Sequence, residues 1–376
     1  MKVAKSAERQ GSWCVKIGDT ILSQCVDGKH PKMANGWGYV SGMALMALAR
    51  LSEHTGDSSY YETAKHHMDL FIRDDGSIHT YILEDYNLDQ INQGKNLFSL
   101  WKRTGEPKYE MAIQRLVTQL IGQPRTSEGG FWHKKIYPFQ MWLDGVYMSS
   151  PFLAEYAKTF DEPRFFDDVA NQILLIERMT RNPKTGLLHH AWDESREQRW
   201  CDNTTGKSLH VWGRAMGWYA MAVVDALEHF PVDHPKRGQI MGLFHRMAHA
   251  IKHAQEQESG LWFQVMDENG REGNYLEASA SCMLTYALAK GIRLNYVNEL
   301  DRSVVRHSFA GILKHFVTED DDGVHLHRIC HGAGLGGIGK YRDGSYEYYL
   351  SEQVVSDALM GVAPFLLAGM EMEKLG

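Results

Sequence analysis

The sequence predicts an all-α fold, an (α/α)6 barrel built from six helical hairpins. Two observations predict it. Segments that are apolar almost all round alternate along the chain with segments that carry one apolar stripe, and the first kind packs inside a protein while the second kind packs outside. The apolar segments begin near residues 39, 89, 144, 213, 278 and 354, about 60 residues apart, which suits a helical hairpin plus a loop.

The inner helices are expected at residues 42–51, 94–101, 146–157, 214–230, 278–294 and 354–372, and outer partners at residues 61–71, 109–121, 165–179, 236–253 and 300–316. Turn signals separate the first three pairs: TGD at 55–57, TGEP at 104–107 and FDEP at 160–163. A glycine or acidic residue suits a helix exit, and proline suits the first turn of the next helix. The long loops are rich in aromatic residues on one side only, which favours a closed ring over an open α-solenoid or an irregular bundle.

Length and composition limit the possible classes of protein. A chain of 376 residues exceeds the usual size of a single core, but no Pro/Ser-rich linker marks a boundary, so we expect one domain over residues 1–376. The net charge of -7 argues against nucleic-acid or membrane-surface binding, which needs a basic footprint. We expect a monomer or a small homo-oligomer.

Location is predicted from the termini and the cysteines. The first 14 residues are polar and lack the apolar core of a signal peptide, and no apolar run is long enough to span a bilayer. The five cysteines are widely spaced and contain no CxxC pair, which suits free thiols in a reducing compartment. The sequence therefore predicts a cytoplasmic protein.

The stretch MWLDGVYM at 141–148 places Asp144 at the start of a long amphipathic segment. Aspartate is a common helix N-cap, so capping alone would explain the residue. Its neighbours, however, are Trp142 and Tyr147, and desolvation among aromatic rings disfavours the charged form of a carboxyl group. Asp144 is therefore a candidate general acid, provided that burial and a neighbouring Asp89 anion outweigh the field of the helix N-terminus.

Parallel inner helices would place their N-terminal ends at one mouth of the barrel. The residues at these ends are Trp37, Tyr39, Asp89, Gln90, Gln93, Trp142, Asp144, His210, Trp212, Arg214, Trp218, Glu277, Ser279, Tyr348, Tyr349 and Glu352. Loops at 129–137 and 186–193 add Trp132, His133, Lys134, His189, His190 and Trp192. Aromatic walls suit sugar rings. Helix N-termini together with Arg214 and Lys134 favour an anion. The sequence therefore predicts a pocket for an acidic sugar.

Each member of this group also has a simpler interpretation. Trp212 and Trp218 could be ordinary core residues. His189 and His190 could be loop residues that bind backbone groups, and Asp89 could be another helix cap. The combination of all these residues at one mouth favours a site.

Two weaker patterns do not predict a ligand. His325, His327, Cys330 and His331 lie close together, but their spacing matches no standard zinc pattern. The run GLGGIGK at 334–340 has the spacing of a phosphate loop, but Tyr341 stands where Ser or Thr should follow, so we expect a turn-forming loop. The sequence therefore predicts no metal and no cofactor.

Seven stretches resemble the unsaturated rhamnogalacturonyl hydrolases, glycoside hydrolase family 105. They are WGYVSG (37–42), LDQINQGK (88–95), WHKKIYPFQMWLDGVYM (132–148), LLHHAWDES (187–195), WGRAMGW (212–218), YLEASAS (275–281) and GSYEYYLSE (344–352). The resemblance spans nearly the whole chain and implies an (α/α)6-barrel catalytic domain, in agreement with the helical repeat.

The resemblance also implies a substrate and a mechanism. The family acts on short unsaturated uronic-acid oligosaccharides left by pectin lyases, with a C4=C5 double bond at the non-reducing end. It implies that Asp144 protonates C4 and then activates water for addition at C5, while Asp89 shapes the environment of that donor. The residues that it implies for substrate binding are Tyr39, His133, Lys134, Trp142, His190, Trp212, Arg214 and Trp218.

Two alternatives remain at this point. A family 88-like unsaturated glucuronyl hydrolase would share the barrel and the hydration chemistry but act on glycosaminoglycan-derived oligosaccharides. A non-catalytic helical barrel that binds acidic sugars would need Asp144 to be only a cap.

Overall fold

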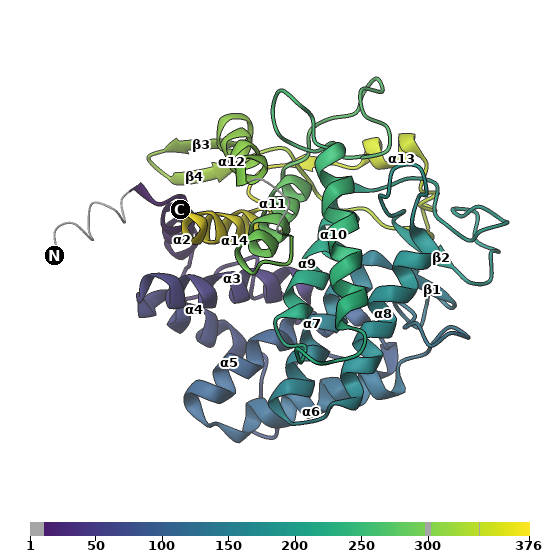
Figure 1. Cartoon of the computed structure of the whole chain (residues 1–376). Helices are drawn as coiled ribbons and strands as arrows, with labels where there is room; N and C mark the ends of the chain where they lie inside the picture. The colour runs from purple at the N-terminus through teal and green to yellow at the C-terminus, as the bar shows by residue number, and fades with distance from the viewer. Residues whose placement is uncertain (1–10, 298–301, 338) are drawn as a thin grey trace.

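The computed structural model describes residues 11–297, 302–337 and 339–376. In these ranges the chain forms a closed ring of inner helices surrounded by outer helices (Figure 1). This architecture confirms the predicted (α/α)6 barrel.

The described residues contain six inner helices that neighbour one another around the ring. They are α3 (Tyr39–Thr55), α5 (Lys95–Thr104), α7 (Leu143–Thr159), α9 (Gly213–Leu227), α11 (Ala278–Arg293) and α14 (Leu359–Leu375). Each packs on the next, and α14 packs back on α3. Every residue of α9 is buried, as an element in the middle of a barrel requires. The contact between α14 and α3 excludes an open solenoid.

The outer helices of the described residues each cover one inner helix. They are α2 (Trp13–Ser23), α4 (Ser58–Asp69), α6 (Pro107–Gly122), α8 (Arg164–Thr180), α10 (Arg237–His253) and α12 (Arg302–Phe316). Residues 300 and 301, where the fifth outer helix was expected to begin, lie outside the described residues. The sixth outer helix is α2, which packs on α14, so the first and last helices of the described chain form one hairpin (Figure 1).

Helix α2 was not predicted, although the sequence carries its signals. Ser12 is its N-cap, because the side-chain oxygen accepts a hydrogen bond from the backbone N–H of Val15. Ile17 and Ile21 follow at a spacing of one turn, and both are buried. The helix is short, and the polar residues between its few apolar ones make the apolar stripe hard to recognise in the sequence.

Two predicted starts were wrong. The sixth inner helix begins at Leu359 rather than residue 354, because Asp357 has a left-handed backbone (φ 54°) and its carboxylate accepts a hydrogen bond from Leu326 N. The second inner helix does not begin near residue 89, because two 3₁₀ turns precede α5, η2 (Leu88–Gln90) and η3 (Asn92–Gly94). A further 3₁₀ turn, η1 (Leu83–Asp85), lies just before them.

Short strands and a short helix decorate the barrel. The strands pair as β1 (Gln140–Trp142) with β2 (Ala191–Asp193), β3 (Val317–Asp320) with β4 (Gly323–Leu326), and β5 (Ile329–Cys330) with β6 (Val354–Val355), all antiparallel. Helix α13 (Tyr346–Ser351) lies with β1 and β2 on the side of Figure 1 opposite the C-terminus. The β1–β2 pair and α13 mark the end of the barrel where the inner helices begin.

Two further features complete the fold. The predicted loop at 334–340 is confirmed for its described residues, and Gly336 and Gly337 have positive φ angles of 63° and 102°; Ile338 lies outside the described residues. Within the described ranges, a search for a helix long and apolar enough to cross a membrane found none.

Close packing inside the ring gives a test of this arrangement. A Cβ atom on Gly42 of α3 would lie 2.5 Å from the backbone Cα of Gln93, so Gly42→Ala must displace η3. We expect a loss of about 1–3 kcal/mol in the free energy of unfolding. Gly242→Ala, on outer helix α10, meets only the flexible end of Arg246 at 3.7 Å and should be neutral or stabilising. Thermal denaturation followed by circular dichroism measures both, and equal stability of Gly42→Ala and the wild type would contradict the packing.

Candidate active site

Asp144 is the second residue of α7, not its cap. The N-cap is Trp142, which is extended (φ -116°, ψ 147°) because it belongs to β1, and it makes no side-chain capping bond. The Asp144 side chain is 13 % exposed, and its Oδ2 lies 3.1 Å from Nε2 of His190. The simple capping interpretation is therefore wrong.

His190 is fully buried and fixed on both ring nitrogens. Its Nδ1 lies 2.8 Å from the hydroxyl of Tyr349. Burial raises the pKa of Tyr349 well above its ordinary value. The phenol therefore stays protonated, and its O–H donates a hydrogen bond to Nδ1. The remaining Nε2–H then donates to Oδ2 of Asp144. Within the described residues Oδ1 of Asp144 has no hydrogen-bond partner, so it is available to a ligand.

The β1–β2 ladder brings Asp144 and His190 together. Trp142 pairs with Ala191, and the backbone N–H of Leu143 donates to the His190 carbonyl at 3.0 Å. The rings of Trp142 and Trp212 lie 5.4 Å and 4.9 Å from the His190 ring. Of the two candidate histidines, His190 is therefore the one beside Asp144.

Asp89 forms an ion pair with Lys134, and this pair defines the second acid of the site. The Lys134 ammonium lies 2.6 Å from Oδ2 of Asp89, and Nε2 of His133 lies 3.6 Å from Oδ1. Burial opposes ionisation of Asp89, but Lys134 and His133 hold its pKa below the ordinary value. The backbone N–H of Leu88 donates to the His133 carbonyl at 3.1 Å, which joins η2 to the loop before β1.

His133 lies in a stack of aromatic rings. Its ring stacks on Trp142 at 4.5 Å, and the ring of Tyr137 stacks on the same indole at 5.2 Å and lies parallel to His133 at 6.5 Å. Burial lowers the pKa of His133 to about 4, so the ring is neutral near pH 7. A Cβ atom on Gly145 would lie 3.0 Å from Nδ1 of His133, which explains the glycine that follows Asp144.

Tyr39 begins α3 and is partly exposed. Its ring meets Trp218 edge to face at 6.2 Å. Burial, together with the charges of Asp89 and Asp144, raises the pKa of Tyr39. Its hydroxyl is therefore a proton-bearing donor within the field of both carboxyl groups.

Trp212 and Trp218 are only 2 % exposed. The indole N–H of Trp212 donates to Gln264 at 3.2 Å, and Trp218 stacks on Tyr147 at 4.8 Å. Both rings therefore pack beneath the site residues, and almost none of their surface is exposed to a ligand. Partly exposed aromatic residues at this end include Tyr39, Tyr137 and Trp132.

Arg214 is also only 2 % exposed, and its guanidinium binds protein groups. Its Nε–H donates to Ser279 at 2.8 Å, and its terminal nitrogens donate to the carbonyls of Cys330 and His331. Glu277, a fully buried N-cap of α11, lies 3.8 Å away. Since Lys134 is engaged by Asp89, neither cation expected to capture an anion stands free in this structure.

The sequence did not predict Arg342 as a site residue, and it predicted only the place of Tyr349. Arg342 donates to the Tyr137 hydroxyl at 2.9 Å and lies in the field of Lys134, so it adds a cation at this end. It follows the glycine-rich loop, and no sequence pattern singles it out. Tyr349 was expected at the mouth, but its bond to His190 depends on the tertiary structure alone.

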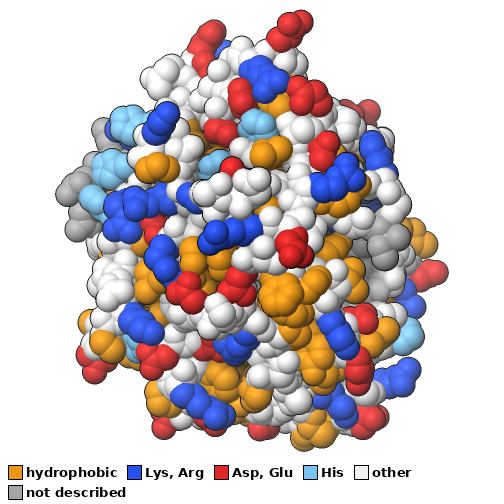
Figure 2. Space-filling view, turned by 90° about the vertical axis from the view of Figure 1, so that its right-hand side faces the viewer, with side chains coloured by type: hydrophobic (Ala, Val, Ile, Leu, Met, Phe, Trp, Pro, Cys, Tyr) orange, Lys and Arg blue, Asp and Glu red, His pale blue; other side chains and the backbone are white. Residues whose placement is uncertain are grey.

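Two further histidines expected at the mouth have other partners. His189 lies in the field of Asp267 and Lys207, and burial lowers its pKa. His210 binds Asp267 at 3.3 Å. Figure 2 shows the face that carries β1, β2 and α13, where acidic, basic and hydrophobic side chains are interspersed.

The histidines near residue 330 do not converge on one point. His325 contacts Asp357 at 2.9 Å and Asp320 at 3.1 Å. His327 contacts Thr318 and Ser356 instead. Cys330 is buried and accepts a hydrogen bond from Gln264.

The Asp89–Lys134 pair predicts a pH-dependent stability. The lowered pKa of Asp89 stabilises the fold at pH values above the pKa of an unfolded aspartate, and this contribution disappears as the pH falls through the folded pKa. Lys134→Gln should therefore cost about 1–3 kcal/mol near pH 7 and progressively less in acid. Lys135→Gln, at the exposed neighbour, is the matched control. Chemical denaturation over a pH series measures the difference, and a constant difference at all pH values would contradict the pairing.

Arg214→Gln separates a structural role from ligand capture. Loss of the contacts to Ser279, Cys330 and His331 should lower the thermal midpoint clearly, because buried carbonyls and Glu277 lose their partner. If Arg214 acted only by binding an anionic ligand, KM would rise roughly 10- to 100-fold with unchanged thermal stability. Thermal denaturation together with steady-state kinetics distinguishes the two roles.

Comparison with known proteins shows the family of this chain. The chain matches the family model described as Glycosyl Hydrolase Family 88 over residues 13–376. The solved structure of a family 105 glycoside hydrolase from C. acetobutylicum ATCC 824 is 42% identical, with a TM-score of 0.93, over 96% of this chain and 99% of that chain.

Two curated proteins are also similar. Protein Atu3128 of Agrobacterium fabrum is 40% identical over 230 residues, which is 60% of this chain and 97% of that protein. The unsaturated rhamnogalacturonyl hydrolase YesR of Bacillus subtilis is 28% identical over 274 residues, 71% of this chain and 74% of that protein. The family resemblance expected from the motifs is thereby confirmed: the chain belongs to glycosyl hydrolase family 88 and is a glycoside hydrolase of the type shared by families 88 and 105.

Proposed function

We propose that this chain, an unsaturated uronyl hydrolase of the family 88 and 105 type, removes the C4=C5 unsaturated galacturonic acid from the non-reducing end of rhamnogalacturonan fragments. The observation that carries the proposal is the state of Asp144, a partly exposed carboxyl group with Oδ2 held by His190 and Oδ1 without a partner among the described residues. The 42% identity to a family 105 enzyme and the similarity to YesR support the pectic substrate.

The reaction needs one group that gives a proton and then takes one. In its acid form Asp144 transfers the Oδ1 proton to C4 of the enol ether, and positive charge develops at C5 and the ring oxygen. The resulting carboxylate then removes a proton from a water molecule as that water adds to C5. The hemiketal opens to a ketone and releases the neighbouring sugar, so one water is consumed and Asp144 regains its proton.

His190 and Asp89 support this cycle in different ways. His190 keeps a hydrogen bond to Oδ2, which aims Oδ1 outward in both protonation states of Asp144. Asp89 is held as an anion by Lys134, and a fixed negative charge stabilises the positive charge that develops on the sugar. Ordinary glycosidases instead place two carboxyl groups on either side of the scissile bond.

We assign substrate contacts to the residues around these acids. The Tyr39 hydroxyl can donate to the sugar ring, while His133, Lys134 and Trp142 form the wall on the side of Asp89. His190, Trp212, Arg214 and Trp218 form the floor, since all four are buried. Arg342 at the rim is a further candidate for the substrate carboxylate, because its Nη1 has no partner among the described residues.

We treat the chain as one catalytic domain, because helices from both ends of the described chain complete the same ring. We also propose a cytoplasmic location, which the five free cysteines of the structure support.

Asp144→Asn tests the proposal. The substitution removes the transferable proton but keeps the size of the side chain and its contact to His190, so we expect a loss on the order of 100-fold or more in kcat with the fold intact. Turnover is measured by loss of the ultraviolet absorbance of the C4=C5 double bond. Asp85→Asn, at an exposed neighbouring acid, is the control and should retain activity.

The choice of substrates decides the finer assignment. Unsaturated disaccharides from rhamnogalacturonan and from glycosaminoglycans are compared by kcat/KM, and a preference for the glycosaminoglycan product would contradict the pectic assignment. Binding without loss of absorbance on any substrate, or residual activity of Asp144→Asn above about a tenth of the wild type, would contradict the catalytic role of Asp144.

A further inference from the structure

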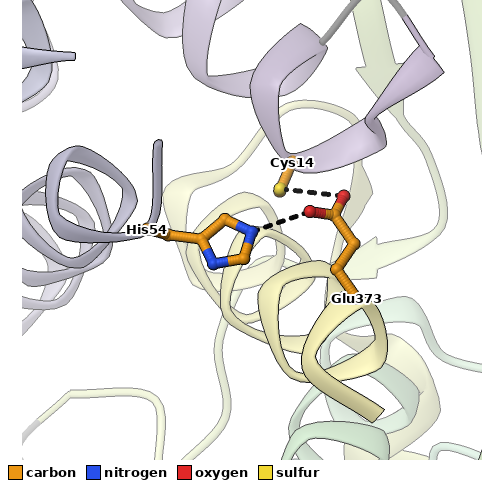
Figure 3. A group of neighbouring side chains, drawn as sticks. All are labelled: Cys14, His54 and Glu373. Carbon is orange, nitrogen blue, oxygen red and sulfur yellow. Dashed lines mark hydrogen bonds and ion pairs between the residues drawn. The ribbon is translucent and has the colours of Figure 1, made fainter. Parts of the chain in front are cut away.

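Three side chains with metal-binding atoms meet at the end of the barrel opposite Asp144. They are Cys14 of α2, His54 of α3 and Glu373 of α14 (Figure 3). Their ligand atoms all lie within 4.8 Å of one another. Oε2 of Glu373 lies 2.7 Å from Nε2 of His54, and Oε1 accepts from the Cys14 thiol at 3.2 Å. The group therefore joins the first helix, the first inner helix and the last helix of the described chain.

The surroundings of Cys14 differ from those of an ordinary core cysteine. The residue is fully buried, yet its sulfur faces polar groups, the Glu373 carboxylate and the Ser12 hydroxyl at 3.0 Å. Gly369 permits this approach, because a Cβ atom there would lie only 3.2 Å from Cβ of Cys14. The close packing of α2 on α14 thus holds the sulfur beside the carboxylate.

The helix ends favour a cation bound through a thiolate. Cys14 lies in the first turn of α2, where the partial positive charge of the helix N-terminus favours a negative sulfur. Burial raises the pKa of the Cys14 thiol, so the sulfur loses its proton only when a metal ion takes its place. His54 and Glu373 lie in the last turns of α3 and α14, where the partial negative charge of the free carbonyls favours a cation. All three helices therefore present the appropriate end to a metal ion between them.

We propose that Cys14, His54 and Glu373 bind a structural Zn²⁺ ion, with water or the Ser12 hydroxyl as the fourth ligand. Sulfur, imidazole nitrogen and carboxylate oxygen are the ligand types that zinc takes, whereas calcium and magnesium prefer oxygen alone. Tetrahedral zinc at its usual bond lengths separates neighbouring ligand atoms by about 3.5 Å. Reaching that spacing means widening the 2.7 Å contact between His54 and Glu373 within a group that already lies inside 4.8 Å, by movements of roughly 1 Å that the partly exposed His54 and Glu373 side chains permit.

Zinc binding replaces hydrogen bonds by coordinate bonds. A Zn–S bond forms and the thiol S–H bond breaks, and the proton leaves to solvent. The His54 imidazole binds through Nε2 with its proton on Nδ1, and Glu373 binds as a carboxylate. No electron is transferred, because zinc has no redox chemistry in such sites.

The ion would link α2 to α14, the two helices of the hairpin that closes the ring. Helices α2 and α14 come from opposite ends of the described chain, and they pack on each other where the ring closes. A metal bound by the folded chain and not by the unfolded chain stabilises the fold. The site lies at the C-terminal ends of α3 and α14, away from Asp144, so the zinc takes no part in the hydration reaction.

Zinc titration of the full chain tests the proposal. Protein stripped with EDTA is titrated with ZnCl₂ by calorimetry, and the metal retained after dialysis is measured by mass spectrometry. We expect one equivalent of zinc per chain and a rise in the thermal midpoint. Cys14→Ser and His54→Gln should each lose this zinc. The fall in zinc affinity should exceed the roughly 10- to 100-fold that is lost when a group hydrogen-bonded to a metal ligand is removed.

Matched variants control for nonspecific binding. Cys25→Ser changes a cysteine just after α2 whose thiol donates to the carbonyl of Ile21, and His66→Gln changes an exposed histidine. Both should retain one equivalent. His54→Gln decides the outcome if Cys14→Ser fails to fold.

Two results would overturn the zinc site. One is a wild-type chain that retains no zinc after dialysis. The other is zinc uptake that survives in both His54→Gln and Cys14→Ser, which would assign the metal to other histidines and leave Glu373 as a simple hydrogen-bond acceptor.

Discussion

The active-site geometry depends on the register of one short antiparallel ladder. Because Trp142 pairs with Ala191, the residue two positions after Trp142 and the residue just before Ala191 are forced together, and these are Asp144 and His190. Because the backbone at Trp142 is extended, α7 begins at Leu143. Asp144 therefore lies in the first turn, and its side chain is not the N-cap. A slip of one residue in this ladder would turn Asp144 away from the imidazole.

Ring closure provides the second constraint. The first turns of the inner helices can share one mouth only if α14 returns to α3, and α2 covers the joint between them. The proposed catalytic acids and the proposed zinc ligands thus occupy opposite ends of the same ring. The proposed reaction takes place where the inner helices begin, and the proposed zinc site lies where α3 and α14 end.

Much of this arrangement could be predicted from the sequence. Apolar segments repeated along the chain predicted the inner helices, because helical periodicity and burial are local consequences of composition. Six of the predicted site residues also lie together in the structure, namely Asp89, Lys134, His133, Trp142, Asp144 and His190.

The rest depends on contacts that are distant in the sequence. Helix α2 finds its partner at the other end of the chain, so no local hairpin pattern reveals it. The Tyr349–His190 bond spans 159 residues. Arg214 and Lys134 carry charges that suit an anion, but their protein partners, which are visible only in three dimensions, engage those charges. Composition shows which charges are present, and only the fold shows how they are paired.

The central claim is that one fixed carboxyl group protonates C4 of the unsaturated sugar from one face. Turnover in heavy water, stopped early and analysed by nuclear magnetic resonance, tests this directly. The account predicts a single deuterium at C4 of the released product with one stereochemistry. Release of a sugar that keeps its double bond and carries no deuterium at C4, or deuterium on both faces, would contradict it.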